Sequence, residues 1–507
     1  MYITRTTVKI PSSIVRTGWI KLNTKPASLS MSTSTYFDAF RQRLMPLSTK
    51  FYLQKGEIEV LQLPAQFYST MKDKISMAQH RIFFASLYLG KSEQELMDCI
   101  DNAMEKTPTL KVYFLLDGLR GTRETPKANS SASLLANLVA KYGDDRIHCR
   151  LYRTPAFHGW KKKLIPKRFN EGLGLQHMKI YGFDNELILS GANLSNDYFT
   201  NRQDRYYVFN SKLLTDYYFN LHQLISSLSF KIEAIKDSVN PFANYKLTWP
   251  KTNLSVDPTE LGNKHKFLSD SSKAVNEFLH TNQNTSQKTE ATNESCSTIV
   301  YPVSQFTPLF KKFNDQSTEK PTVLSIISGI NSSSLNWLFT AGYFNMLPSI
   351  KHKLLKTPVT DSKIITASQY ANGFFESKGV SGNLPKAYIH LSRKFLKSLA
   401  LYGKTDQVHL MEWQKGVVTQ PGGWSYHAKG FWIFDGLIPN NPFLTIIGSS
   451  NYTKRAYSLD LESNVIILTK DEELQQNIGS EVTHLLKHCN EVTLKNFKED
   501  EDKQVGL

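Results

Sequence analysis

The stretch His177-Met-Lys-Ile-Tyr-Gly-Phe-Asp184 decides the fold, because it places two reactive side chains at the start of an apolar run. Residues two apart in an extended strand point to the same face, so His177 and Lys179 project together. A second pair, His427-Ala-Lys429, also leads into an apolar run. The sequence therefore predicts two similar strands, each presenting an imidazole and an ammonium group.

Each His-x-Lys pair is followed by a small-residue turn with an asparagine and then by an acid. These are Asn193 and Asp204 in the first half, and Asn451 and Glu462 in the second. The asparagine and the acid lie 11 residues apart in both halves (193 to 204, 451 to 462). The interval from His to Asn is 16 residues in the first half and 24 in the second, and a longer turn at 436–442 accounts for the difference. The pattern indicates a divergent internal duplication.

The chain, at 507 residues, is too long for one ordinary core. Strand-like and helix-like segments alternate in both halves, which predicts an α/β protein of two α/β/α lobes with mixed sheets. A pseudo-twofold between the lobes would place the active site at their interface. The expected boundaries are a transit peptide with a disordered N-terminus at 1–45, lobes at 46–250 and 301–492, a polar linker at 251–300 and a charged tail at 493–507.

The expected elements follow from apolar periodicity. The predicted strands are 81–89, 110–118, 146–152, 178–184, 186–192 and 205–210 in the first lobe, and 322–329, 363–368, 408–413, 430–435, 443–449 and 464–469 in the second. The predicted helices are 65–80, 92–106, 131–142 and 472–488.

Two such halves packed face to face would gather two His, two Lys and two Asn around one tetrahedral phosphate. Neutral imidazole can attack phosphorus and form a phospho-histidine, while the second histidine acts as acid and then as base. Cations and amides would hold the phosphate oxygens, and an acid would bond the far ring nitrogen of each histidine. These supporting residues are Lys179, Lys429, Asn193, Asn451, Asp204 and Glu462. We expect that the chemistry itself requires no metal or other cofactor, because no cluster of metal-ligating residues is visible, and the sequence leaves open whether a divalent ion assists substrate binding.

The composition of the chain gives predictions about its binding partners and its cellular compartment. The formal charge is +16 (61 basic and 45 acidic residues), which suits polyanionic partners. Residues 1–37 contain basic and hydroxyl residues but no acid, as in a mitochondrial transit peptide. The four cysteines are scattered, which favours reduced thiols over a zinc site. No run reaches the ~18 apolar residues of a membrane span, so we expect peripheral membrane contact.

Three further segments have more than one interpretation. A basic run with aromatic ends could seat the protein on an anionic bilayer or be a solvated loop; its residues are Trp160, Lys161, Lys162, Lys163, Lys167 and Arg168. Arg120 and Arg123 could bind a substrate phosphate or form a salt-bridged turn.

The segment Ala85-Ser-Leu-Tyr-Leu-Gly-Lys-Ser92 fits a loose P-loop pattern through Ala85, Gly90, Lys91 and Ser92. Its interior is not glycine-rich, which favours a strand end with Ser92 as a helix N-cap and Glu95 completing a capping box.

The residues around the first half-site resemble a known family. His177 to Asp184 matches the H-x-K-x(4)-D motif of the phospholipase D superfamily, whereas Asp435 falls one residue late in the second copy. Within that superfamily, 174–179, 189–195 and 198–206 resemble the mitochondrial CDP-diacylglycerol–glycerol-3-phosphate 3-phosphatidyltransferases. Similar matches occur at 85–90, 372–375, 426–430 and 460–462.

The resemblance implies phospholipase-D-like lobes and a defined reaction. His177 would attack CDP-diacylglycerol and expel CMP, and glycerol 3-phosphate would then take the phosphatidyl group, feeding phosphatidylglycerol and cardiolipin synthesis. His427 would act as acid and base. Asp184 belongs to the catalytic motif, and we expect it to be structural or to support the site rather than to take part directly. The resemblance also implies the mitochondrion, at the matrix face of the inner membrane, and no nucleic-acid partner.

Other functions stay open from the residues alone. A phosphodiesterase of the same fold acting on nucleic acid would also use two His-x-Lys pairs and a basic surface. Another CDP-diacylglycerol-dependent phosphatidyltransferase, such as one making phosphatidylserine, is a second alternative. A non-enzymatic membrane scaffold is a third, and it leaves the duplicated site unexplained.

Overall fold

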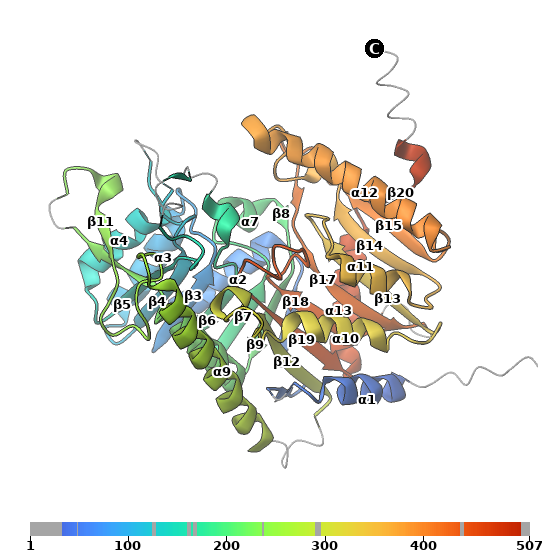
Figure 1. Ribbon diagram of the computed structural model, residues 1–507, viewed down its shortest axis with the longest axis horizontal. Helices are drawn as coiled ribbons and strands as arrows, with labels where there is room; N and C mark the ends of the chain where they lie inside the picture. Colours follow the sequence, from blue (N-terminus) through green and yellow to red (C-terminus); the bar gives the residue numbers. More distant parts are fainter. Residues whose placement is uncertain are drawn as a thin grey trace, which may run out of the picture.

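Two large sheets lie side by side in the computed structural model, one in each half of the chain (Figure 1). The structure describes residues 33–47, 49–123, 128–159, 164–165, 170–235, 238–288, 296–436 and 441–497. Within these ranges each large sheet has nine strands, and a two-stranded sheet of β8 (Arg202–Gln203) and β16 (Ser425–Tyr426) joins the halves.

The first-lobe sheet combines a parallel and an antiparallel part. Strands β3 to β5 are mutually parallel, and β6, β7 and β9 continue the sheet antiparallel. The strand order is β11 (Tyr245–Thr248), β10 (Phe230–Ala234), β5 (Ile147–Tyr152), β4 (Lys111–Asp117), β3 (Arg81–Ser86), β6 (Ile180–Phe183), β7 (Glu186–Ser190), β9 (Tyr206–Asn210) and β2 (Ile58–Leu61).

The second-lobe sheet repeats this arrangement. Strands β13 to β15 are mutually parallel, and β17, β18 and β19 continue the sheet antiparallel. The order is β1 (Phe51–Leu53), β12 (Thr298–Gln305), β19 (Glu462–Thr469), β18 (Pro442–Gly448), β17 (Lys429–Asp435), β13 (Leu335–Ala341), β14 (Ser362–Ala367), β15 (Val408–Trp413) and β20 (Cys489–Val492). The shared topology shows that the duplication seen in the motifs extends to the fold.

Alternating side chains in each central strand enter two different cores, because successive residues of a strand face opposite ways. In β3, Ile82 and Phe84 pack in a cluster with α2 (Pro64–Met77), α3 (Gln94–Lys106) and α4 (Ser131–Tyr142). Phe83 and Ala85 face α8 (Lys212–Ser226), in a cluster that continues into the second lobe through α13 (Glu472–Leu486). The lobes therefore share one core.

The outer face of the second lobe is covered by helices. These are α1 (Thr33–Leu44), α10 (Glu319–Gly329), α11 (Pro348–Leu355) and α12 (Leu384–Leu401). Residues 322–329, expected as a strand, belong to α10, and β13 at 335–341 was not predicted. A short apolar run does not distinguish a buried helix from a strand, so the prediction was wrong there.

Three expected segments also differ. Residues 33–44, expected to be disordered, form α1, which buries Phe37 and Phe40 in the second lobe. Residues 51–53 of the expected first lobe pair with β12 of the second. Segment 251–300, expected as a linker, contains α9 (Lys264–Lys288), whose Phe267 and Val275 join the shared core. Residues 1–32 and 498–507 lie outside the described part.

Candidate active site

The two His-x-Lys segments meet at the interface of the lobes, where each pairs with the segment before the other lobe's acid. The His177 N–H donates to the Leu461 carbonyl over 2.9 Å. The His427 N–H donates to the Gln203 carbonyl over 2.8 Å, continuing the pairing of β8 with β16. The backbone thus brings His177 next to Glu462, and His427 next to Asp204.

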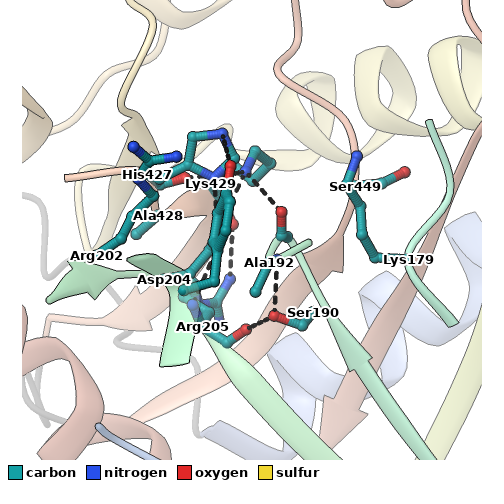
Figure 2. A network of polar contacts seen from close by, with 12 residues as sticks. Lys179, Ser190, Ala192, Arg202, Asp204, Arg205, His427, Ala428, Lys429 and Ser449 are labelled. Carbon is teal, nitrogen blue, oxygen red and sulfur yellow. Dashed lines mark hydrogen bonds and ion pairs between the residues drawn. The ribbon is translucent and has the colours of Figure 1, made fainter. Parts of the chain in front are cut away.

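Each histidine is held by the acid of the opposite lobe. His177 Nδ1 lies 3.0 Å from both carboxylate oxygens of Glu462. His427 Nδ1 lies 2.7 Å from Asp204 Oδ2 (Figure 2). An acid bonded to Nδ1 fixes the tautomer that leaves Nε2 available for chemistry.

The two lysines are fully buried among these groups. Lys179 Nζ donates to the His177 carbonyl over 2.6 Å, and Lys429 Nζ donates to the His427 carbonyl over 2.9 Å. Lys429 Nζ also lies 3.4 Å from Asp204 Oδ2. Burial lowers the pKa of Lys179 to about 7, and it lowers the pKa of Lys429 as well.

Burial also lowers the histidine pKa values, and the lysines add to the effect. The pKa of His177 falls well below its usual range, because of burial and then of Lys179. The pKa of His427 falls to about 3, because of burial and then of Lys429, although Asp204 opposes this. Lowered pKa values for four basic groups mean that the site favours an added negative charge, which a phosphate would supply.

Both half-sites form one electrostatic unit. The charge of Lys429 acts on His177 as well as on His427. Asn193 and Asn451 each have a buried amide oxygen without a hydrogen-bond partner among the described residues. Since the two ends of an amide are interchangeable by a flip, each can offer N–H donors to a ligand.

Asp184 lies away from this group, at the turn after β6. Its carboxylate accepts the backbone N–H groups of Gln79, His80 and Arg81 at 2.8–2.9 Å. We therefore assign it a structural role, although it is part of the H-x-K-x(4)-D motif and was grouped with the catalytic residues. Asp435 lies buried at the end of β17, in register with Leu335.

The candidate phosphate-binding arginines make contacts with other protein side chains. Arg120 stacks over the Tyr88 ring at 4.5 Å, and Arg123 forms an ion pair with Glu171. The membrane-surface candidates Trp160, Lys161, Lys162, Lys163, Lys167 and Arg168 lie outside the described residues.

The P-loop interpretation is wrong. The Gly90 N–H donates to the Leu194 carbonyl, and a Cβ there would overlap the Glu93 side chain, so the segment packs against protein. Ala85 lies in β3, while Lys91 and Ser92 form the turn before α3, whose N-cap position is Glu93 and not Ser92.

Three residues beside His427 were not predicted. The Tyr198 hydroxyl lies 3.4 Å from His427 Nε2 and 3.1 Å from the Asn193 amide nitrogen. The Tyr343 ring meets the His427 ring edge-on at 5.4 Å. Arg202 lies next to His427 (Figure 2). The position of Arg202 two residues before Asp204 was a usable signal, but its meaning depends on the pairing between lobes.

The described part of the chain holds no group of three or more His, Cys, Asp or Glu side chains that could bind a metal ion. Among the same residues, every helix is too short or too polar to cross a bilayer.

The chain is similar in sequence to enzymes that share one name. The CDP-diacylglycerol–glycerol-3-phosphate 3-phosphatidyltransferase of Saccharomyces pastorianus is 54% identical over 100% of this chain and 96% of its own length. The human mitochondrial enzyme of the same name is 32% identical over 92% of this chain and 83% of its own. No family model matches the chain.

A solved phosphatidylserine synthase of Haemophilus influenzae has a TM-score of 0.63 at 20% identity, covering 89% of this chain and 92% of its own. At this level of identity the likeness shows the fold, and the expected two-lobed α/β fold is confirmed.

Proposed function

The chain belongs to the CDP-diacylglycerol–glycerol-3-phosphate 3-phosphatidyltransferase family, and we propose that its crossed histidine–carboxylate pairs carry the transfer through a phosphatidyl-histidine. The enzyme transfers the phosphatidyl group of CDP-diacylglycerol to glycerol 3-phosphate and releases CMP. The observation that supports the proposed mechanism is that two buried histidines, each oriented through Nδ1, share one site with two lysines.

In the first step His177 is the nucleophile. Its lowered pKa keeps the imidazole neutral, and Glu462 at Nδ1 directs the Nε2 lone pair toward phosphorus. The Nε2–P bond forms as the P–O bond to CMP breaks. His427, protonated when the phosphate charges raise its pKa, gives its proton to the departing oxygen.

In the second step His427 acts as the base. It takes the proton of the 1-hydroxyl of glycerol 3-phosphate, whose oxygen attacks phosphorus and releases His177. Lys179, Lys429 and the two asparagine amides hold the non-bridging oxygens, where negative charge develops. These side chains supply the nucleophile, the proton carrier and the compensating charge, so we propose that no cofactor is needed for the chemistry.

We propose that the protein is mitochondrial, since its human relative is named so. We propose that it works at the matrix face of the inner membrane, bound peripherally to anionic lipid through the basic run that includes Lys161, Lys162 and Lys163. Two exposed leucines support this: Leu164, 71% exposed, lies within that run, and Leu261, 86% exposed, lies beside Gly159. Apolar tips next to basic residues suit a lipid–water interface.

Vesicle sedimentation tests this docking. Reversing Lys161, Lys162 and Lys163 to Glu should weaken binding to vesicles with anionic lipid by at least tenfold. Reversing the exposed Lys311, Lys312 and Lys356 serves as the matched control. Equal losses in the two triple variants would refute a specific docking site.

One assay tests the reaction and excludes its competitors. Purified protein is given CDP-diacylglycerol with glycerol 3-phosphate, serine or water, and CMP release is followed; an oligonucleotide is offered separately. We expect CMP release that depends on glycerol 3-phosphate and that continues in the presence of a chelator. We expect no cleavage of the oligonucleotide. His177→Ala and His427→Ala should each abolish turnover, whereas the exposed His265→Ala should not. Substantial turnover by either single active-site variant would contradict the shared-site mechanism.

A further inference from the structure

Arg202 lies closer to the reacting groups than its place in the sequence suggests. It sits on β8, opposite Ser425 of β16 and two residues before Asp204. Its positive charge lowers the pKa values of both His427 and Lys429. Arg202 therefore belongs to the electrostatic environment of the His427 half-site.

The guanidinium group is held in a fixed position. Its Nε donates to Ser425 Oγ over 2.9 Å, and its Nη2 donates to Asp197 Oδ2 over 3.0 Å. Its plane covers the Tyr198 ring at 4.6 Å, and the Tyr198 hydroxyl lies 3.4 Å from His427 Nε2. The side chain is 13% exposed. Guanidinium has five N–H donors, and these bonds use two, so donors remain for a ligand next to the catalytic ring.

The other half-site has the opposite charge at the matching position. Two residues before Glu462 stands Asp460, which accepts the Leu175 N–H over 3.0 Å and pairs with Arg455 at 2.9 Å. The nearby Arg455 is therefore neutralised by a buried carboxylate. Arg202, in contrast, pairs with Asp197, whose side chain is 57% exposed and screened by water. The asymmetry favours an anion on the His427 side.

The proposed reaction places a phosphate there twice. If His177 attacks phosphorus, CMP departs from the opposite side, next to His427. The acceptor hydroxyl must then attack the phosphatidyl-histidine from the side that CMP left. CMP and glycerol 3-phosphate both carry a phosphate monoester, so one cation beside His427 can serve both.

We propose that Arg202 is the residue that binds the phosphate of glycerol 3-phosphate, and before it the phosphate of departing CMP, and so selects a phosphorylated acceptor. This inference rests on the proposed function and on the order of the two histidines. It predicts that loss of Arg202 affects acceptor recognition far more than attack on CDP-diacylglycerol.

Steady-state kinetics of Arg202→Gln and Arg202→Lys test the assignment. We expect Arg202→Gln to raise the KM for glycerol 3-phosphate about 10- to 100-fold, the range for loss of a charge-assisted hydrogen bond. Its preference for glycerol 3-phosphate over unphosphorylated glycerol should fall by a similar factor. Inhibition by CMP should weaken in parallel. Arg202→Lys keeps the positive charge but loses the paired N–H donors of the guanidinium group, so it should raise the KM for glycerol 3-phosphate less than Arg202→Gln does. The exposed Arg41→Gln on α1 is the control.

The outcomes separate the inference from the function it rests on. A KM within twofold of wild type in Arg202→Gln, or an equal loss with glycerol 3-phosphate and with water, would overturn the role of Arg202. Unchanged CMP inhibition beside a raised KM would overturn the shared position. Wild-type protein that releases CMP without regard to glycerol 3-phosphate would overturn the proposed function itself.

Discussion

Asp204→Asn changes one atom and should disable one half of the reaction. The Asp204 carboxylate accepts from the Arg205 N–H at 2.9 Å through Oδ1 and binds His427 Nδ1 at 2.7 Å through Oδ2. Lys429 Nζ lies 3.4 Å from the same Oδ2. Asparagine has the same shape but a single acceptor oxygen, so it cannot satisfy donors on both sides.

The Arg205 N–H sets the orientation of the new amide, and that orientation prevents His427 from acting as a base. With its oxygen toward the Arg205 N–H, the amide presents NH₂ to His427 Nδ1 and to the Lys429 ammonium group. His427 then accepts at Nδ1 and carries its proton on Nε2, where no lone pair remains to take the proton of the acceptor. Two charge-assisted contacts are lost, each worth about 1.5–3 kcal/mol, which predicts a fall in kcat of about 10²- to 10⁴-fold.

Rapid-quench kinetics with CDP-diacylglycerol labelled in the phosphatidyl group distinguishes the two steps. In Asp204→Asn both steps lose the help of His427, but transfer to glycerol 3-phosphate should slow more, because a weakly basic phosphate departs with little need of a proton whereas the attacking hydroxyl must lose one. Label should therefore accumulate on the protein. In Glu462→Gln, attack by His177 should become slow, so no labelled protein should accumulate. Asp98→Asn, at an exposed site on α3, is the control. The reverse pattern would show that His427 is the nucleophile, and a kcat within fivefold of wild type would refute the role of Asp204.

Three further predictions concern stability. Asp184→Ala should lower the free energy of unfolding by about 1–3 kcal/mol, because three N–H groups lose their acceptor, while kcat of the folded fraction stays within twofold; a large loss of kcat would return Asp184 to the catalytic set. Arg205→Met should lower the free energy of unfolding in urea by about 3–5 kcal/mol, because it leaves the Glu481 carboxylate buried without its 2.8 Å partner. The double variant Arg205→Met/Glu481→Leu should lose less stability, and an equal loss in both variants would contradict this explanation. Burial raises the pKa of Glu319 from 4.5 to about 8, so folded protein retains a proton that the unfolded chain releases, and stability should fall as the pH rises from about 4.5 to 8. Glu319→Gln lacks that titrating group. In urea unfolding, its free energy of unfolding relative to wild type should therefore be a few kcal/mol higher at pH 8.5 than at pH 4.5. Identical pH profiles of the two proteins would refute the assignment.

The sequence predicted the members of the site better than their partners. Strand periodicity places His177 and Lys179 on one face, and the equal spacing from Asn193 to Asp204 and from Asn451 to Glu462 marks equivalent places in two copies. Periodicity does not say which copy an acid serves. The packing of the lobes determines which histidine each acid contacts. The crossed pairs and the role of Arg202 could therefore not be predicted from the sequence.

The same limit explains the errors in the fold. Helix α10 contains the run Thr322-Val-Leu-Ser-Ile-Ile-Ser-Gly329, which suits a strand or a buried helix equally by apolar content. Helix α1 lies in a basic, hydroxyl-rich stretch, and it buries Tyr36, Phe37, Phe40 and Leu44 against the second lobe. Where tertiary contacts decide local structure, local patterns mislead.

The crossed pairs make catalysis depend on the assembly of the lobes. Neither lobe contains a complete half-site, because His177 takes its acid from β19 and His427 takes its acid from the segment before β9. The same segments exchange backbone hydrogen bonds between lobes at Leu175 and Leu461. Arg205, adjacent to Asp204, reaches across to Glu481 and to the Ile446 carbonyl. A small rotation between the lobes would therefore misalign both histidines together, so perturbing Arg205 should lower kcat under conditions where the protein is still folded.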